Sequence, residues 1–212
     1  GGASSPEAFW ELLRSGRDPM IPVPPDRWDL DAFYDPTPAT PGKMYVREAS
    51  FVDDVDQFDP EFFNVSPREA ASMDPQQRLM LEVSWEALER ARLATPDLKG
   101  SRVAVFVGVG DSGYLQRFQK PGGPLYADMY AGTGSLSAFV SGRVAYALGV
   151  HGPNLALNTA CSSSLVATHL GVQALRSGEC EAALVGGVHL MLSPENFVYV
   201  SQLKALASDG RC

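Results

Sequence analysis

The chain has 212 residues, of which 45% are hydrophobic and 20% are charged, as expected for a globular protein with a buried core. Its net charge of −8 and its scattered basic residues argue against a nucleic-acid-binding protein. No apolar stretch approaches the roughly 18 residues that a membrane-spanning helix needs, so we expect no membrane association.

The two ends of the chain are typical of a piece of a longer polypeptide. Residue 1 is a glycine rather than an initiator methionine, and the first residues lack the basic start and apolar middle of a signal peptide. Residues 208–212 resemble a turn that leads into a further element. We therefore expect residues 1–212 to be a fragment.

The N-terminal region predicts one helix and then a long irregular segment. Residues 6–14 predict an amphipathic helix, because Ser4 or Ser5 can cap it and Pro6 suits its first position. Residues 18–60 predict an irregular surface segment, because seven of the 16 prolines lie between Pro19 and Pro41. Its aromatic residues predict that it packs on a core: Trp28, Phe33, Tyr34 and Tyr45.

Predicted helices and strands alternate along the rest of the chain. We expect helices at residues 75–91, 135–148, 161–177 and 195–206, and strands at residues 102–109, 154–160 and 182–192. Asp74 can cap the first of these helices, Gly149 can end the second, and Ser193 can cap the last. The alternation predicts an α/β fold with a parallel sheet covered by helices on both faces.

Two of these elements carry more specific predictions. The helix at residues 75–91 has polar residues at helical spacing, which predict one solvent-facing stripe: Arg78, Glu82, Glu86, Glu89 and Arg90. Its other positions, Val83 and Ala87 among them, are expected to be mostly buried. In the last strand, Gly186 and Gly187 predict a bulge or a close approach of two backbones.

The chain has three cysteines: Cys161, Cys180 and Cys212. An odd number with wide and unpatterned spacing predicts neither a disulfide framework nor a zinc site. Reduced thiols are typical of a cytoplasmic protein. We expect no metal and no bound cofactor in this chain.

Cys161 is the strongest candidate for a functional residue. It follows the predicted strand at 154–160 and opens the predicted helix at 161–177, where backbone N–H groups and the helix dipole favour a thiolate. A thiolate there could act as a nucleophile, with the Cys161 N–H as an oxyanion donor. The hydroxyls of the three serines that follow could bind first-turn N–H groups. The alternative is a small buried cysteine with a packing role.

A glycine-rich segment is a weaker candidate. Residues 108–113 read G-x-G-x-x-G directly after a predicted strand, and Asp128 lies 20 residues after the first glycine, as in a dinucleotide-binding fingerprint. The segment then breaks at the Pro-Gly-Gly-Pro of residues 121–124, and Asp128 does not end a second strand. A glycine-rich loop at the edge of a sheet is the favoured interpretation.

The histidines and a group of acidic residues predict structural rather than catalytic roles. His169 lies eight residues after Cys161 on the same predicted helix, about 12 Å along its axis and too far for a hydrogen bond. His151 lies in a turn, and His189 is predicted inside a buried strand. The cluster of Asp53, Asp54 and Asp56 predicts a solvated turn.

The octapeptide of residues 158–165, NTACSSSL, resembles the active-site motif DTACSSSL of β-ketoacyl synthases, specifically the ketosynthase domains of modular type I polyketide synthases. The resemblance covers nearly the whole chain and is specific. It extends to residues 51–63, 66–70, 73–78, 141–146, 152–153, 176–180, 186–188 and 208–212.

The resemblance implies a thiolase-like fold, in which two similar halves of sheet and helices stack into five layers. The chain would form only the N-terminal half, as one partial ketosynthase domain over residues 1–212. The first strand of the family would precede it, and the strand that closes the first sheet would follow it.

The resemblance also implies a decarboxylative Claisen condensation. Cys161 would hold an acyl group, which condenses with a malonyl-type extender carried on the phosphopantetheine arm of an acyl carrier protein. A neighbouring acyltransferase domain and a second copy of the chain would be further partners. The family's two catalytic histidines and its lysine lie in motifs that this chain lacks, so only Cys161 is carried over.

One position departs from the family motif. Asn158 stands where the family usually has aspartate, which keeps a hydrogen-bond acceptor and removes a charge. A cysteine at position 161 argues against the family's loading-type decarboxylases, which carry glutamine there. Two alternatives remain: a catalytically incompetent fragment or dimer-contact module, and, with less support, a thiolase-type degradative enzyme.

Overall fold

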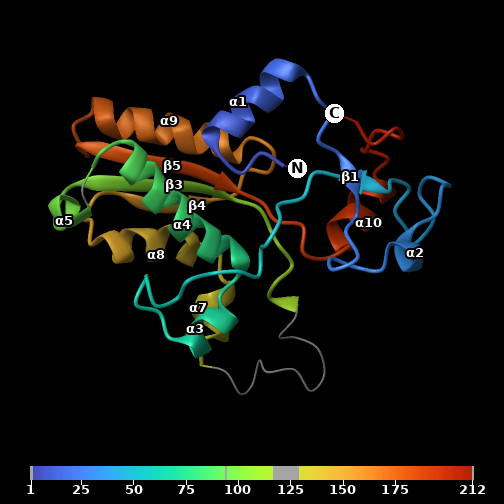
Figure 1. Ribbon diagram of the computed structural model, residues 1–212, viewed down its shortest axis with the longest axis horizontal. Helices are drawn as coiled ribbons and strands as arrows, with labels where there is room; N and C mark the ends of the chain where they lie inside the picture. Colours follow the sequence, from blue (N-terminus) through green and yellow to red (C-terminus); the bar gives the residue numbers. More distant parts are fainter. Residues whose placement is uncertain (1, 94, 117–128, 212) are drawn as a thin grey trace. The chain divides into compact units, whose positions relative to one another are not determined.

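The computed structural model describes residues 2–93, 95–116 and 129–211. The chain divides into two compact units, one of residues 1–54 with 191–212 and the other of residues 55–190. Figure 1 shows the elements of both units with their labels. Across the described ranges, no helix combines the length and the apolar character that a bilayer crossing requires.

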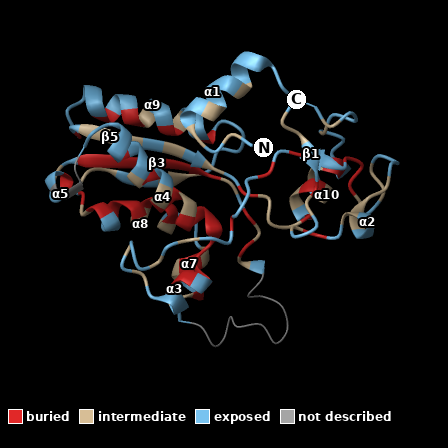
Figure 2. Cartoon of the chain, viewed as in Figure 1, coloured by how far each residue is buried: buried red, intermediate tan, exposed pale blue. Residues whose placement is uncertain are grey.

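The larger unit contains a parallel sheet, as predicted. Its described strands are β3 (Val103–Val109), β4 (Asn154–Leu157) and β5 (Ala182–Val188), in the order β4-β3-β5. Every residue of β3 is buried, because strands pair with both of its edges and helices cover both of its faces (Figure 2). Because the three strands are parallel, their carboxyl ends lie at the same edge of the sheet.

Helices cover both faces of this sheet (Figure 1). One face packs against α9 (Ser163–Arg176), and the other packs against α4 (Pro75–Arg90) and α8 (Ala138–Leu148). Because side chains alternate along a strand, Val105 joins the core under α4 and α8, whereas Phe106 joins the core under α9. The short helices of this unit are α3 (Pro67–Ser72), α5 (Thr95–Leu98) and α7 (Ala131–Ser135).

The ends of several elements differ from the predictions. Asp74 caps α4 and Gly149 ends α8 with a φ of 65°, as predicted. The helix predicted at 135–148 begins later, at Ala138, because Leu136 adopts an extended conformation. The short helix α7 before it was not predicted. The predicted strands at 154–160 and 182–192 end earlier, at Leu157 and Val188. Their last predicted residues lie in the turns that leave the sheet.

The prediction for the surface of α4 was partly wrong. Arg78 is buried because its guanidinium donates to backbone oxygens of Met73 and Asp56 and lies within hydrogen-bond distance of the Tyr114 hydroxyl. These acceptors replace the water molecules that the Arg78 guanidinium loses on burial. Val83 is 46% exposed and Ala87 is exposed, although both were predicted to be buried.

The smaller unit is mostly irregular and has a core of its own. It contains residues 18–54 of the segment 18–60 that was predicted to be irregular and packed on a core. Its elements are α1 (Pro6–Ser15), β1 (Ile21–Pro22), α2 (Leu30–Phe33), β2 (Glu48–Ala49) and α10 (Glu195–Gln202). Trp28 packs edge-on against Phe51 and contacts Phe197 in this core. Ser5 caps α1, whereas α10 has no side-chain cap and ends four residues before the predicted Leu206.

Candidate active site

Cys161 lies in the turn between β4 and α9, and it is exposed. Ala160 has a φ of 56°, in the left-handed region that residues with a Cβ rarely adopt. The turn is held from within. The Asn158 side-chain oxygen accepts a hydrogen bond from Ala160 N (2.9 Å), and Ser163 Oγ accepts one from Thr159 N (2.8 Å). The predicted position of the thiol, between a strand and a helix N-terminus, is confirmed.

The alternative of a buried packing cysteine is wrong for Cys161 and describes Cys180 instead. Cys180 is 4% exposed and belongs to the core between β3 and α9. Cys212 lies outside the described residues. The role of Cys161 in chemistry stays a prediction.

The serines after Cys161 hold the turn rather than the helix. We expected their hydroxyls to bind N–H groups in the first turn of α9, but Ser162 makes no side-chain cap. Ser162 Oγ donates to Thr159 O (2.8 Å), and Ser163 Oγ donates to Ala160 O (2.7 Å). Both hydroxyls therefore reach back to the backbone that precedes Cys161, and α9 begins two residues after it.

Two glycines allow the first turn of α9 to lie directly on the sheet. A Cβ on Gly108 of β3 would come within 2.8 Å of the Ser163 backbone and 2.9 Å of Ser164 N, and a Cβ on Gly187 of β5 would come within 2.9 Å of Ser164 Cβ. The predicted bulge is wrong, because the pairing of β3 with β5 continues through Gly186 and Gly187. The close neighbour of Gly187 is the side chain of Ser164 rather than a second backbone. We call Gly108 and Gly187 the glycine seat of α9.

Asp74, at the start of α4, holds the loop that follows β3. Its carboxylate accepts hydrogen bonds from Gln76 N (2.8 Å) and from the Ser112 hydroxyl (2.5 Å). Burial raises the pKa of the Asp74 carboxyl above its ordinary value, and the hydrogen bonds from Ser112 and Gln76 oppose this rise. The same loop and Asn158 line a hollow of about 220 Å³.

The raised pKa of Asp74 predicts a pH-dependent stability. A pKa above its unfolded value favours the protonated carboxyl in the folded state, so this contribution to the free energy of unfolding is greatest at low pH. The contribution is lost as the pH rises through the raised pKa. The variant Asp74→Asn keeps one acceptor oxygen for the cap to Gln76 N, and its amide nitrogen would donate to the Ser112 hydroxyl in place of the second acceptor contact. Because it carries no charge, we expect it to gain stability relative to the parent as the pH rises.

Urea unfolding of the parent and of Asp74→Asn, from acidic to neutral pH, measures how the free energy of unfolding of each protein depends on pH. The matched control is Ser112→Ala, which removes a donor that favours the charged carboxylate, so its stability should fall more steeply with rising pH than that of the parent. An Asp74→Asn variant that loses stability relative to the parent as the pH rises would contradict the direction of the shift.

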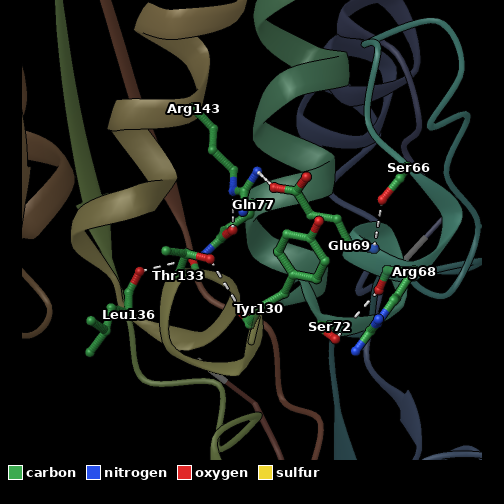
Figure 3. A network of polar contacts seen from close by, with 9 residues as sticks. All are labelled: Ser66, Arg68, Glu69, Ser72, Gln77, Tyr130, Thr133, Leu136 and Arg143. Carbon is green, nitrogen blue, oxygen red and sulfur yellow. Dashed lines mark hydrogen bonds and ion pairs between the residues drawn. The ribbon is translucent and has the colours of Figure 1, made fainter. Parts of the chain in front are cut away.

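A second polar network joins four helices at the N-terminal end of α4, and the sequence analysis missed it (Figure 3). Gln77 is fully buried and donates to Thr133 O (3.0 Å) and Leu136 O (3.4 Å). Arg143 donates to Gln77 Oε1 (2.8 Å) and forms a largely buried ion pair with Glu69 (2.6 Å). The signal in the sequence was the pair of uncharged glutamines, Gln76 and Gln77, at the start of a helix that was predicted to be mostly buried.

The structure does not bring the histidines to Cys161. The Cys161 thiol makes no hydrogen bond with any described residue, and His151, His169 and His189 are all exposed. The prediction that His189 lies inside a buried strand was wrong, because β5 ends at Val188 and the ring of His189 packs on Gly110. Within the described ranges, no group of histidine, cysteine and acidic side chains could hold a metal ion.

The acidic cluster and the glycine-rich segment lie in a turn and a loop. Asp53, Asp54 and Asp56 are all exposed, as predicted for a solvated turn. Residues 110–115 form a loop after β3, as the loop interpretation predicts. Asp128 and residues 121–124 lie outside the described residues.

Comparisons with known proteins identify the family. The model of the β-ketoacyl synthase N-terminal domain matches residues 1–212. The chain is 52% identical to the spectinabilin polyketide synthase system protein NorC of Streptomyces orinoci, over 100% of the chain and 9% of that protein. It is 50% identical to the polyketide synthase GfsA of Streptomyces halstedii, over 100% of the chain and 3% of that protein.

Solved ketosynthase structures have the same fold. The oxazolomycin ketosynthase domain OzmH KS7 of Streptomyces albus JA3453 matches with a TM-score of 0.89 at 42% identity, over 97% of this chain and 36% of that one. The ketosynthase from module 6 of the bacillaene synthase of Bacillus subtilis 168 matches with a TM-score of 0.86 at 34% identity, over 100% of this chain and 34% of that one.

The chain therefore belongs to the β-ketoacyl synthase family, and it corresponds to the N-terminal domain of that family. Its relatives are polyketide synthases, and its fold is the thiolase-like α/β fold of their ketosynthase domains. The chain spans about a third of the two solved ketosynthases and less than a tenth of the two polyketide synthases.

Proposed function

We propose that this chain supplies the acyl-carrying thiol of a polyketide ketosynthase and that Cys161 is the nucleophile. One observation carries the proposal: in a chain that matches the family from residue 1 to residue 212, Cys161 is exposed at the turn from a parallel strand into a helix. A nucleophile needs this access, because the acyl donor must reach the sulfur along a defined direction.

The first half of the reaction moves the acyl group onto Cys161. The sulfur attacks the carbonyl carbon of an acyl thioester, and a new carbon–sulfur bond forms. The bond from that carbon to the phosphopantetheine sulfur of the acyl carrier protein breaks, and the carrier leaves as a thiol with the proton lost by Cys161. The backbone N–H of Cys161 and the positive end of α9 would stabilise the negative charge on the carbonyl oxygen.

The second half forms the carbon–carbon bond. A malonyl-type extender on a carrier protein loses CO₂, and the resulting carbanion attacks the acyl carbon on Cys161. The bond between that carbon and the Cys161 sulfur breaks, and protonation of the sulfur restores the thiol. The product is a β-ketoacyl chain on the carrier protein. The histidines that assist the family's second step have no counterpart among the motifs of residues 1–212, so we place them outside this chain.

The proposed partners follow from the same chemistry. The acyl carrier protein delivers both substrates, and a neighbouring acyltransferase domain would load the extender. We also propose a homodimer, with residues 135–148 and 154–160 as the region of contact. The thiol, rather than a bound cofactor, is what this chain itself would supply to the reaction.

Mapping of the acyl group tests the proposal. The complete ketosynthase domain that contains this chain is incubated with a short-chain acyl N-acetylcysteamine thioester, digested, and analysed by mass spectrometry. We expect the acyl mass on the peptide that contains Cys161 and none on the peptide that contains Cys180. Acyl label on a different residue would refute the assignment. A folded domain that takes up no label would instead support a non-catalytic, dimer-contact module.

A further inference from the structure

Gln76 is a buried polar residue that joins the ends of two neighbouring strands. Its side chain is 2% exposed and makes two hydrogen bonds, one as a donor and one as an acceptor. The side-chain nitrogen donates to Gly110 O (3.0 Å), just after β3, and the side-chain oxygen accepts from Leu190 N (2.8 Å), just after β5. One amide therefore connects the carboxyl ends of β3 and β5 from the N-terminal end of α4.

These two strand ends also carry the glycine seat of α9. Gly108 lies two residues before Gly110, and Gly187 lies three residues before Leu190. At a rise of about 3.3 Å per residue, the longer of these two segments spans about 10 Å of extended chain. The first turn of α9 contacts both glycines without an intervening side chain. A shift of either strand end is therefore passed directly to Ser163 and Ser164.

The turn that carries Cys161 depends on the position of Ser163. Thr159 N donates to Ser163 Oγ, which in turn donates to Ala160 O. The contacts thus run from Gln76 to the strand ends, from the strand ends to the first turn of α9, and from Ser163 to the backbone on both sides of Ala160. The steps are the two hydrogen bonds of Gln76, two or three residues of covalent chain, the close packing of α9 on the two glycines, and the hydrogen bonds of Ser163.

We propose that Gln76 is a positioning residue for Cys161, which sets the spacing of the strand ends on which the first turn of α9 rests. The choice of Cys161 as the reacting thiol rests on the proposed function. The pairing of β3 with β5 ends at Val109 and Val188, and one further backbone bond, from Gly110 N to Val188 O (2.9 Å), continues it. Beyond that bond, Gln76 is the side chain that holds Gly110 and Leu190 together.

The test compares two neighbouring buried glutamines in the complete ketosynthase domain. Gln76→Met keeps the volume of the side chain and removes both of its hydrogen bonds. The matched control is Gln77→Met, which makes the same chemical change at the next residue of α4 but contacts α7, α8 and Arg143 instead of the strand ends. Both variants are expected to lower the melting temperature, because each leaves buried polar groups unpaired.

Only the Gln76 variant should alter the site. We expect its first-order rate of acylation by the thioester to fall about tenfold per folded molecule, with the half-saturating thioester concentration changed less than about twofold, because a small misplacement of a reacting group affects the chemical step most. Gln77→Met should keep the rate of the parent. Gln76→Glu keeps an acceptor for Leu190 N but loses the donor to Gly110 O and buries a carboxyl group, so its rate should also fall below that of the parent. It gives a second measurement if Gln76→Met fails to fold.

Amide hydrogen exchange gives a readout that does not require acyl transfer. In Gln76→Met, we expect faster exchange at Thr159 and Ala160, whose N–H groups are bonded within the turn, and unchanged exchange there in Gln77→Met. Equal acylation and equal exchange in the two variants would overturn the positioning role. Altered exchange in Gln76→Met, together with a folded parent domain that takes up no acyl group, would refute the proposed function and leave the positioning of the turn intact.

Discussion

Replacement of Cys161 by alanine is expected to abolish acyl transfer, with a fall in rate of about 10³-fold or more, because removal of a nucleophile leaves only substrate binding and electrostatic effects. The substitution removes one exposed sulfur atom at a position outside the helix. We therefore expect the free energy of unfolding to change by less than about 0.5 kcal/mol. Transfer of a radiolabelled acyl group from a carrier protein, measured beside a thermal melt, separates the two effects.

Cys180→Ala is the matched control for this prediction. It removes the same atom from a buried site in the core between β3 and α9, so it should lower stability by about 1 kcal/mol or more while acyl transfer per folded molecule persists. Acyl label that remains on the protein after Cys161→Ala would show that another group carries the substrate. Loss of label in both variants would point to unfolding as the common cause.

The second large effect is expected at Gly108. A methyl group there would lie 2.8 Å from the Ser163 backbone and 2.9 Å from Ser164 N, so the strain falls on backbone atoms that cannot rotate away. Gly108→Ala is expected to cost about 1–3 kcal/mol of unfolding free energy by overpacking. It should also displace the first turn of α9 and lower the rate of Cys161 acylation at least about tenfold.

Gly132→Ala is the control for the Gly108 prediction, because Gly132 is an exposed helical glycine of α7 and a Cβ there would meet no atom within 4 Å. It should be neutral or raise stability by about 0.5–1 kcal/mol, since alanine favours the helix over glycine. Urea unfolding and acylation kinetics measure both variants. A Gly108→Ala protein with the acylation rate of the parent would show that the close contact at the glycine seat does not set the position of the thiol.

Local signals in the sequence predicted the longer helices and the strands of the larger unit, but not its short helices α3, α5 and α7. The apolar run at residues 102–109 became the buried central strand, and Asp74, Pro75 and Gly149 acted at the helix ends as expected. These signals work because caps and strand burial depend on residues within one or two turns of each other. The errors lie at ends decided by distant contacts, as at Leu136 and Val188.

In the candidate site, too, features set by neighbouring residues were predicted and features set by distant contacts were not. Cys161 was found from its own neighbours, because its turn is held by hydrogen bonds that span at most four residues. The polar residues of α4 were misjudged because their partners lie far away in the chain. Gln76 contacts Leu190, 114 residues later, and Gln77 contacts Arg143, 66 residues later. No periodicity within one helix predicts such partners.

The sequence by itself determined the family, the parallel α/β fold and the cysteine at the start of a helix, because motif spacing and hydrophobic periodicity are written along the chain. Only the tertiary structure decided that Cys161 is exposed, that α9 rests on Gly108 and Gly187, and that Gln76 joins the two strand ends beneath it. These features depend on how three strands and two helices meet at one edge of the sheet. Packing, rather than local propensity, therefore sets the position of the thiol.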